Sequence, residues 1–457
     1  GLRTLGRGVG WLLAGTLLVG VALSGVVTPA TQSAAYAEVG YSDGRREPAV
    51  KPVPYRAWGR EHPGYALHPA YGTAVVPDSL LATFPSRPTR VRLLFAKPQD
   101  ALYSPDGAVN AIAITNQTFY LGGSFHYVGP QTGPAITFNL ATGEAEERLP
   151  RIEGDVFAAE SDGTGGWFLA GQFNSVGGHP ITHLVHLRAD RTVDTEWTAQ
   201  VTGTRINTLA RSGSRLYFGG QFTRVGTQTR SGLAAVNVTD GSVLPWNPAV
   251  QGQVNTLKLS SDLAYVGGSF QAIGNSNRAN IAAIRLETGT ATAWNPSASD
   301  GSVYALAVTD SEVFAGGAFS TIGTKPRSRL AALDRITGVA ANWNPSPNGT
   351  VRALVVTDTA VYVGGDFTTI AVQSRRGFAG ISRSGLGAAL PVDIHITDTS
   401  TAGLVQTLWL HGETLYIGGG FVNVQGGRHP MIAAVNVTTD APVRTIPLGT
   451  TYNGTSD

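Results

Sequence analysis

Four arginines occupy one place in a repeated pattern, and their side chains are the clearest candidates for chemistry in this chain. Each lies eight residues after a repeated phenylalanine: Arg230, Arg278, Arg327 and Arg375. If the repeats form a ring, equivalent positions lie on a circle, and the guanidinium groups form an arc on one face. Two interpretations follow. Either each arginine ties its loop to carbonyls or carboxylates of an adjacent repeat, or the arc binds acidic glycans or a partner protein.

A second candidate lies between a Gly-Gly pair, replaced by Ala170-Gly171 in the second repeat, and the repeated phenylalanine, at a position where the residue varies. This position holds Ser124, Gln172, Gln221, Ser269, Ala318, Asp366 and Gly420. Asp366 is the only charged residue among them, and a carboxylate there can act as a general base or bind a cation. A lone carboxylate lacks the partner that such chemistry usually needs, so the alternative is a hydrogen-bonded aspartate at a strand end. Asp366 joins the four arginines as a candidate binding residue.

Three histidines, His179, His183 and His186, lie close together in the sequence and raise the question of a metal site. If a strand spans the last two, they are an odd number of residues apart and point to opposite faces, so they cannot bind one ion. The sequence also lacks a Gly-x-Ser-x-Gly elbow, a His-Glu-x-x-His pair and a phosphate-binding glycine loop. We therefore predict no catalytic residue, no metal site and no cofactor.

The candidates belong to a sequence repeat marked by Gly-Gly-x-Phe. The marker phenylalanines are Phe125, Phe173, Phe222, Phe270, Phe319, Phe367 and Phe421, so the period is 48 or 49 residues, and 54 at the last step. A period of this length is typical of a propeller blade of four short strands. The 58 glycines and 14% charged residues favour strands and turns over helices. We predict an all-β fold, with a seven-bladed β-propeller of four-stranded antiparallel blades over residues 109–457.

The fifth repeat shows the expected strands most clearly, at 303–308, 313–319, 330–333 and 339–343. The Gly-Gly pair fits a place where crowded blades leave no room for a Cβ, and the phenylalanine after it fits a plug between adjacent sheets. A tryptophan recurs in the fourth strand of four repeats, where we expect it to pack against the neighbouring sheet. These residues are Trp197, Trp246, Trp294 and Trp343.

The chain begins with a segment typical of export. Arg3 and Arg7 precede an apolar run over residues 9–27, and a small-x-small pattern follows at 35–37. A run of this length can also cross a membrane, so an uncleaved anchor is the alternative. We predict a signal peptide or membrane anchor over 1–37. Residues 38–108 are rich in proline and predict an irregular arm, with a possible closing strand over 91–95 that pairs with a terminal blade.

Charge argues against nucleic acid as a partner. The chain has 33 Lys and Arg and 31 Asp and Glu, and two of the basic residues, Arg3 and Arg7, lie in the N-terminal 37 residues. The rest is therefore formally neutral, whereas affinity for phosphates requires clustered positive charge. The chain has no cysteine, so disulfides and thiolate chemistry are both absent.

The repeat motifs together resemble a known family. One unit contains Leu330-Ala331-Ala332-Leu333-Asp334, Trp343-Asn344-Pro345 and Val361-Tyr362-Val363-Gly364-Gly365-Asp366-Phe367. It resembles the delta-60 type of bacterial extracellular β-propeller repeat, and its Gly-Gly pair is similar to that of kelch repeats. The resemblance extends from about Val109 to about Leu448. It implies a propeller in a secreted bacterial protein and no particular activity.

These observations predict an exported, non-enzymatic β-propeller that acts as a binding or scaffold module for a protein or glycan at the bacterial cell surface. Loops at the blade ends would supply the contacts. One alternative is a propeller enzyme that acts on extracellular polysaccharide, which needs two carboxylates roughly 5–9.5 Å apart. The other is the outer lobe of a membrane assembly, anchored through residues 9–27.

Overall fold

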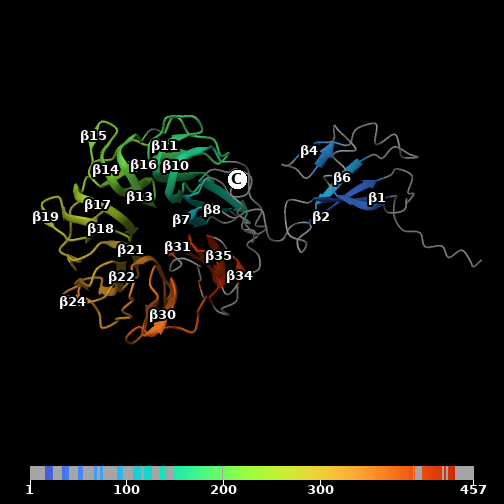
Figure 1. The fold of residues 1–457 in the computed structure, drawn as a ribbon. Coiled ribbons are helices and arrows are strands. Elements are labelled where there is room, and N and C mark those ends of the chain that lie inside the picture. Colours follow the sequence, from blue (N-terminus) through green and yellow to red (C-terminus); the bar gives the residue numbers. More distant parts are fainter. Residues whose placement is uncertain are drawn as a thin grey trace, which may run out of the picture. The chain divides into compact units, whose positions relative to one another are not determined.

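The computed structural model describes residues 107–114, 118–125, 134–139, 149–197, 199–394, 396, 404–421, 423–424, 427–428 and 431–437. Before residue 107 it describes the strands within 16–23, 33–40, 50–54, 66–68, 73–75 and 90–95. The chain divides into two compact units, Gly1–Gln99 and Asp100–Asp457. The described elements of both units are β-strands (Figure 1). No helix long and apolar enough to cross a membrane occurs among these residues.

The first unit contains a sheet of order β3-β1-β2-β6 and a hairpin of β4 with β5. The strands are β1 (Thr16–Leu23), β2 (Ser33–Gly40), β3 (Val50–Pro54), β4 (Ala66–His68), β5 (Thr73–Val75) and β6 (Arg90–Phe95). The strand expected at 91–95 therefore forms. It pairs with β2, where Leu94 lies opposite Tyr36, and its predicted pairing with a terminal blade stays a prediction. A short apolar strand adds to an available sheet edge, and β2 offers one within the same unit.

In the second unit, antiparallel sheets of three main strands follow one another along the chain, with the second strand in the middle. We number these sheets in chain order. Within the described residues they are sheet 1, β7 (Ala108–Ile114), β8 (Thr118–Ser124) and β9 (Ala135–Asn139); sheet 2, β10 (Ile152–Ser161), β11 (Trp167–Val176) and β12 (Leu184–Leu187); sheet 3, β13 (Val201–Ser212), β14 (Arg215–Val225) and β16 (Leu233–Asn237); sheet 4, β17 (Val250–Leu259), β18 (Leu263–Ile273) and β20 (Ile281–Arg285); sheet 5, β21 (Val303–Val308), β22 (Glu312–Gly317) and β25 (Leu330–Asp334); sheet 6, β26 (Val351–Val356), β27 (Ala360–Gly365) and β30 (Phe378–Ser382); and sheet 7, β31 (Leu404–His411), β32 (Thr414–Gly420) and β35 (Ile432–Asn436).

Short hairpins follow the middle strands of sheets 3 to 7. In sheets 3 and 4 the end of the middle strand pairs with β15 (Gln228–Thr229) or β19 (Ser276–Asn277). In the later sheets the hairpins are separate pairs, β23 (Thr321–Ile322) with β24 (Lys325–Pro326), β28 (Thr369–Ile370) with β29 (Gln373–Ser374), and β33 (Asn423–Val424) with β34 (Gly427–Arg428). The four predicted arginines directly follow β15, β19, β24 and β29.

In sheets 2 to 6, the segment predicted to form a fourth strand makes a single bridge to the third strand. In sheet 5 the predicted strands at 303–308, 313–319 and 330–333 correspond to β21, β22 and β25. The segment 339–343 instead makes one bridge, between Leu333 and Ala340. The chain then leaves the sheet, because the indole of Trp343 packs on the next sheet and the proline two residues later has no N–H to donate.

The first glycine of each Gly-Gly pair lies against the first strand of the next sheet. A Cβ on Gly316 would lie 2.4 Å from Cγ1 of Val351 in sheet 6. The same contact joins the last sheet to the first, because a Cβ on Gly418 would lie 2.7 Å from Cγ1 of Val109. The sheets therefore surround a common centre, from teal β7 through green and orange to red β35 in Figure 1. This arrangement is a β-propeller.

The second glycine of the pair lies against the backbone of its own sheet. A Cβ on Gly317 would lie 2.1 Å from the carbonyl oxygen of Ser302, and one on Gly365 would lie 2.1 Å from that of Thr350. The phenylalanine that follows is buried, and Phe222 of sheet 3 belongs to a core cluster with Ala170 of sheet 2. Crowding at the glycines and a phenylalanine plug between sheets, both predicted from the sequence, are confirmed.

The repeated tryptophans connect sheets 2 to 5 to the sheet that follows each of them, as expected. Every indole Nε1 donates a hydrogen bond to a backbone carbonyl of the following sheet: Trp197 to Val238 at 2.9 Å, Trp246 to Arg285 at 3.0 Å, Trp294 to Asp334 at 3.0 Å and Trp343 to Ser382 at 2.7 Å. Each ring also packs against an aromatic ring of the middle strand of its own sheet, as Trp246 does with Tyr217. The tryptophans therefore set the spacing and orientation of neighbouring sheets.

Candidate functional site

A β-bulge recurs at one place in the first strand of sheets 1 to 7. The register between first and second strands shifts there, and the residue within the bulge is Asn110, Phe157, Asn207, Asn255, Tyr304, Arg352 or Gln406. A bulge leaves its extra residue out of the ladder and redirects the side chain. All of these residues line a central channel of about 540 Å³. The fold thus presents a ring of non-identical side chains in one cavity.

Two asparagines of this bulge ring join adjacent sheets. Asn207 donates from Nδ2 to the carbonyl of Val254 at 2.8 Å, and Asn255 donates in the same way to Val303 at 3.1 Å. The amide oxygen of Asn255 accepts a 2.7 Å hydrogen bond from Gln253. These amides therefore stabilise the ring of sheets, and their oxygens form a polar wall in the channel.

Arg352 of the bulge ring supplies a positive charge to the same channel. Its guanidinium carbon lies 5.6 Å from the centre of the Tyr304 ring, within the range of a cation–π contact. Its Nη2 lies 3.4 Å from Oδ2 of Asp366. The carboxylate at the variable position thus has an arginine as its partner rather than a second carboxylate. A binding role for Asp366 stays a prediction.

The four predicted arginines share one set of contacts. Each donates to the carbonyl of the preceding residue and to a second carbonyl 14 or 15 residues later in its own sheet, at Leu244, Thr292, Ala341 or Leu390. Arg375 also forms a 3.1 Å ion pair with Asp393. The expected tie to carbonyls exists, but its partner is the arginine's own sheet rather than an adjacent one. Binding through the arc stays a prediction.

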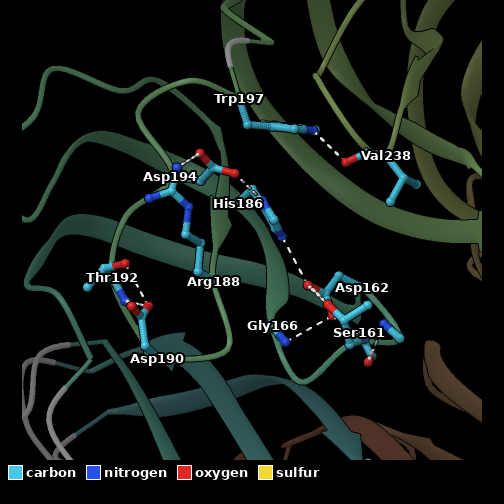
Figure 2. A network of polar contacts seen from close by, with 12 residues as sticks. Ser161, Asp162, Gly166, His186, Arg188, Asp190, Thr192, Asp194, Trp197 and Val238 are labelled. Carbon is cyan, nitrogen blue, oxygen red and sulfur yellow. Dashed lines mark hydrogen bonds and ion pairs between the residues drawn. The ribbon is translucent and has the colours of Figure 1, made fainter.

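His186 lies between two aspartates in sheet 2 (Figure 2). Its Nδ1 is 2.9 Å from Oδ2 of Asp194, and its Nε2 is 3.2 Å from Oδ2 of Asp162. Ionised carboxylates only accept hydrogen bonds, so a ring nitrogen that carries a proton can donate to either aspartate. Arg188 binds the other oxygen of Asp194 at 2.6 Å. This network is a charged, largely buried structural link.

Hydrogen bonds lower the pKa values of both aspartates in the network. Burial by itself would raise the pKa of Asp162, but hydrogen bonds from Thr164, His186 and Gly166 outweigh it and lower the pKa. Burial acts in the same direction on Asp194, and hydrogen bonds and charge from His186 and Arg188 lower its pKa. Both side chains are therefore carboxylates at neutral pH.

The strand expected to span His183 and His186 begins after the first of them, because β12 starts at Leu184. His183 places Nε2 3.1 Å from the carbonyl of Gly203 and has no partner in common with His186. Within the described residues, no group of three or more His, Cys, Asp or Glu side chains is placed to hold a metal ion. The aspartates beside His186 escaped sequence reasoning because the turn and the bridge that carry them are 24 and 8 residues away.

Comparisons with known proteins give fold likenesses only. No family model matches the chain, and no curated protein sequence matches it. The computationally designed protein Ika8 is 15% identical, covers 75% of this chain and 89% of its own, and has a TM-score of 0.44. The WD40 β-propeller domain of Doa1 is 10% identical, with 70% and 91% coverage and a TM-score of 0.46. PorZ, a surface component of the type-IX secretion system of Porphyromonas gingivalis, is 12% identical, with 74% and 44% coverage and a TM-score of 0.36.

Proposed function

We propose that this chain is an exported, non-enzymatic β-propeller with seven blades, of the delta-60 repeat type, which binds a protein or glycan at the bacterial cell surface. Sheets 1 to 7 would be the seven blades, with the contact between Gly418 and Val109 closing the ring. The ligand would be held where the repeat is least uniform. That place is the central channel and its mouth.

The variable residues of the bulge ring are the main observation that supports this proposal. The same bulge recurs in each of these sheets and turns its residue toward the channel, but a structural repeat does not require different residues there. The bulge residues include amides, an arginine, a tyrosine and a phenylalanine, while the neighbouring valines and alanines repeat closely. The channel volume of about 540 Å³ lies within the usual range for ligand sites. The residues beside the bulges therefore repeat closely from sheet to sheet, whereas the residues that face the channel differ.

Export is supported by the N-terminal sequence. Arg3 and Arg7 precede the apolar run over 9–27, and a cleavage pattern follows at 35–37. Cleavage would release a propeller that begins at Glu38, whereas retention would anchor it through residues 9–27. N-terminal sequencing of the native protein distinguishes these forms, because a start at Glu38 excludes the anchor.

Filling the channel tests the binding function. Gln406→Trp introduces an indole at a bulge position, whereas Val372→Trp adds the same side chain at a fully exposed residue. The full chain and both variants are compared for binding to glycan arrays and to immobilised cell-envelope proteins. We expect Gln406→Trp to lose binding at least about tenfold and Val372→Trp to retain it. Binding that survives the filled channel assigns the contact to the outer loops, and no binding by the unmodified chain rejects the function.

One observation favours the alternative, an enzyme that cleaves polysaccharide. Glu160 lines the channel, and burial raises its pKa despite the opposing charges of Lys258 and Arg211. A carboxyl group with a raised pKa is suited to donate a proton. Among the described lining residues, however, Glu160 is the only carboxylate, whereas glycoside hydrolysis uses two. Release of reducing sugar from envelope polysaccharide, lost in Glu160→Gln, would support the enzyme instead.

A further inference from the structure

A second set of equivalent positions lies three residues after each bulge, and some of its side chains line the same channel. The equivalent positions are Ala113, Glu160, Ala210, Lys258, Ala307, Val355 and Trp409. Four of these are small apolar residues, and the other three carry long functional groups. All three long side chains belong to the channel lining. At about 3.3 Å per residue, this set of positions lies roughly 10 Å along the strands from the bulge ring.

The three long side chains approach the channel from different sides. Sheet 3 separates Glu160 in β10 from Lys258 in β17, and sheet 1 separates Glu160 from Trp409 in β31. Sheets 5 and 6 lie between Lys258 and Trp409. A small molecule in the channel would therefore meet a carboxylate, an ammonium group and an indole at three well-separated points of its surface.

Glu160 and Lys258 affect each other's pKa values, but their side chains do not form an ion pair with each other. Burial raises the pKa of Glu160, while the positive charges of Lys258 and Arg211 oppose that rise. Burial lowers the pKa of Lys258, and the charge of Glu160 opposes it. Neither side chain forms a hydrogen bond or ion pair with another described residue. Both charged groups therefore retain free hydrogen-bonding capacity toward the channel.

The indole of Trp409 supplies an uncovered aromatic surface. Trp409 is 36% exposed, whereas the tryptophans that join the sheets are at most 5% exposed. Its position in the other sheets holds alanine, valine, glutamate or lysine, so packing of the repeat does not require an indole there. An aromatic ring open to a channel is suited to contact an apolar or aromatic group of a ligand.

We propose that this second set of positions binds an α-amino acid with an aromatic or large aliphatic side chain. Glu160 would accept hydrogen bonds from the ligand ammonium group, Lys258 would donate to the ligand carboxylate, and Trp409 would contact the side chain. The proposal goes beyond the surface ligand of the preceding section and rests on it only in using the channel as a binding site. A neutral saccharide would satisfy neither charge, whereas a zwitterion satisfies both at once.

Three related ligands test each contact separately. L-phenylalanine carries both charges, phenethylamine lacks the carboxylate, and 3-phenylpropionate lacks the ammonium group. Isothermal titration calorimetry of the full chain should show L-phenylalanine binding roughly 10- to 100-fold more tightly than either analogue, the usual effect of a lost charge-assisted hydrogen bond. Three separate contact points also predict a preference between L- and D-phenylalanine.

Substitutions then assign the contacts. In Glu160→Gln the difference between L-phenylalanine and 3-phenylpropionate should disappear, and in Lys258→Met the difference between L-phenylalanine and phenethylamine should disappear. Trp409→Ala should weaken binding of all three ligands by a similar factor. Glu196→Gln is the matched control, because the side chain of Glu196 is 91% exposed. Thermal unfolding of each variant confirms that it is folded.

The outcomes separate this inference from the proposed surface function. If the unmodified chain binds all three ligands equally or not at all, or if Glu160→Gln and Lys258→Met retain the discrimination, the amino-acid site is rejected. Glycan or envelope-protein binding that persists in that case leaves the surface function in place. Amino-acid binding together with unchanged envelope binding in Gln406→Trp would instead support the site and reject the channel as the surface contact.

Discussion

The indole Nε1 of Trp343 donates a 2.7 Å hydrogen bond to the carbonyl of Ser382, the last residue of the third strand of the next sheet. The same ring packs edge-on against Phe314 of its own sheet, with 5.3 Å between the ring centres. One side chain therefore fixes two neighbouring sheets at once. The chain leaves sheet 5 after a single bridge, and the tryptophan follows three residues after that bridge.

Replacing this tryptophan by phenylalanine should lower stability. Trp343→Phe keeps much of the apolar area but leaves the Ser382 carbonyl without its donor, and we expect a loss of about 1–3 kcal/mol in the free energy of unfolding. Trp409→Phe is the control, because Trp409 is exposed to the channel. Chemical denaturation measures both. An equal loss in the two variants would contradict a special role for the hydrogen bond between sheets.

The two glycines of a pair should respond differently to alanine. In Gly316→Ala the new methyl group meets the Val351 side chain, which can shift, so we expect a loss of about 1–3 kcal/mol. In Gly317→Ala it meets the backbone oxygen of Ser302 at 2.1 Å, which cannot move without breaking the sheet, so the loss should be larger. Ala318→Ser, at the exposed neighbouring position, should change stability little. Equal effects at both glycines would contradict this distinction.

Removing the imidazole from the aspartate network should destabilise the protein by leaving charges unpaired. His186→Ala should cost more than about 2 kcal/mol, because Asp162 and Asp194 remain buried with fewer donors. The repeat itself does not require a histidine at this position, because the equivalent positions in sheets 3 to 5 hold Ala235, Ala283 and Ala332. The expected loss therefore comes from the two aspartates that remain.

A rescue variant tests that explanation. Asp162→Asn and Asp194→Asn, added to His186→Ala, remove the unpaired charges and should restore part of the lost melting temperature. If the triple variant is less stable than His186→Ala alone, the loss arises from packing against Phe168 rather than from charge.

Acid should weaken the fold through the same network. Asp162 and Asp194 have lowered pKa values in the folded protein, whereas an unfolded aspartate titrates near pH 3.9. Their stabilisation is therefore fully present above about pH 4 and is lost as the pH falls through the depressed folded values. Melting temperatures measured from pH 7 to pH 2 should fall less steeply for Asp194→Asn than for the unmodified chain. Parallel curves would contradict the contribution of Asp194.

We expect the repeated arginines to contribute to stability rather than to ligand binding. Arg230 and Arg327 are 7% and 8% exposed and donate to carbonyls of their own sheets, so changing both to alanine should lower the melting temperature. If these contacts are their whole role, the double variant should still bind the surface ligand at a temperature where it is folded. Lost binding with an unchanged melting temperature would instead support the predicted anion-binding arc.

The repeat allowed much of the fold to be predicted, because each sheet uses the same residues for the same contacts. The first three strands of the fifth repeat, the glycine crowding and the tryptophan packing all follow from residue types at fixed spacing. The fourth strand does not, because residue types do not show that the chain makes only one bridge there before it leaves the sheet. The partner of β6 was also missed, since one strand's apolar pattern does not identify the edge that receives it.

The candidate site was harder to predict for a related reason. A bulge is a property of two paired strands, so Asn255 or Arg352 looks like an ordinary strand residue in the sequence. The sequence did contain a signal for the bulge. A valine precedes the bulge in most repeats, whereas the bulge residue itself differs in type between repeats, as in Val254-Asn255 and Val351-Arg352. The partners of Asp366 and His186 lie 8 to 24 residues away and depend on the turns between them.

The contact between Gly418 and Val109 repeats the geometry found between consecutive sheets. At this contact sheets 7 and 1, which are far apart in the sequence, therefore pack as consecutive sheets do. In a circularly permuted protein whose chain is opened between two other sheets, each sheet would form the same two interfaces as before.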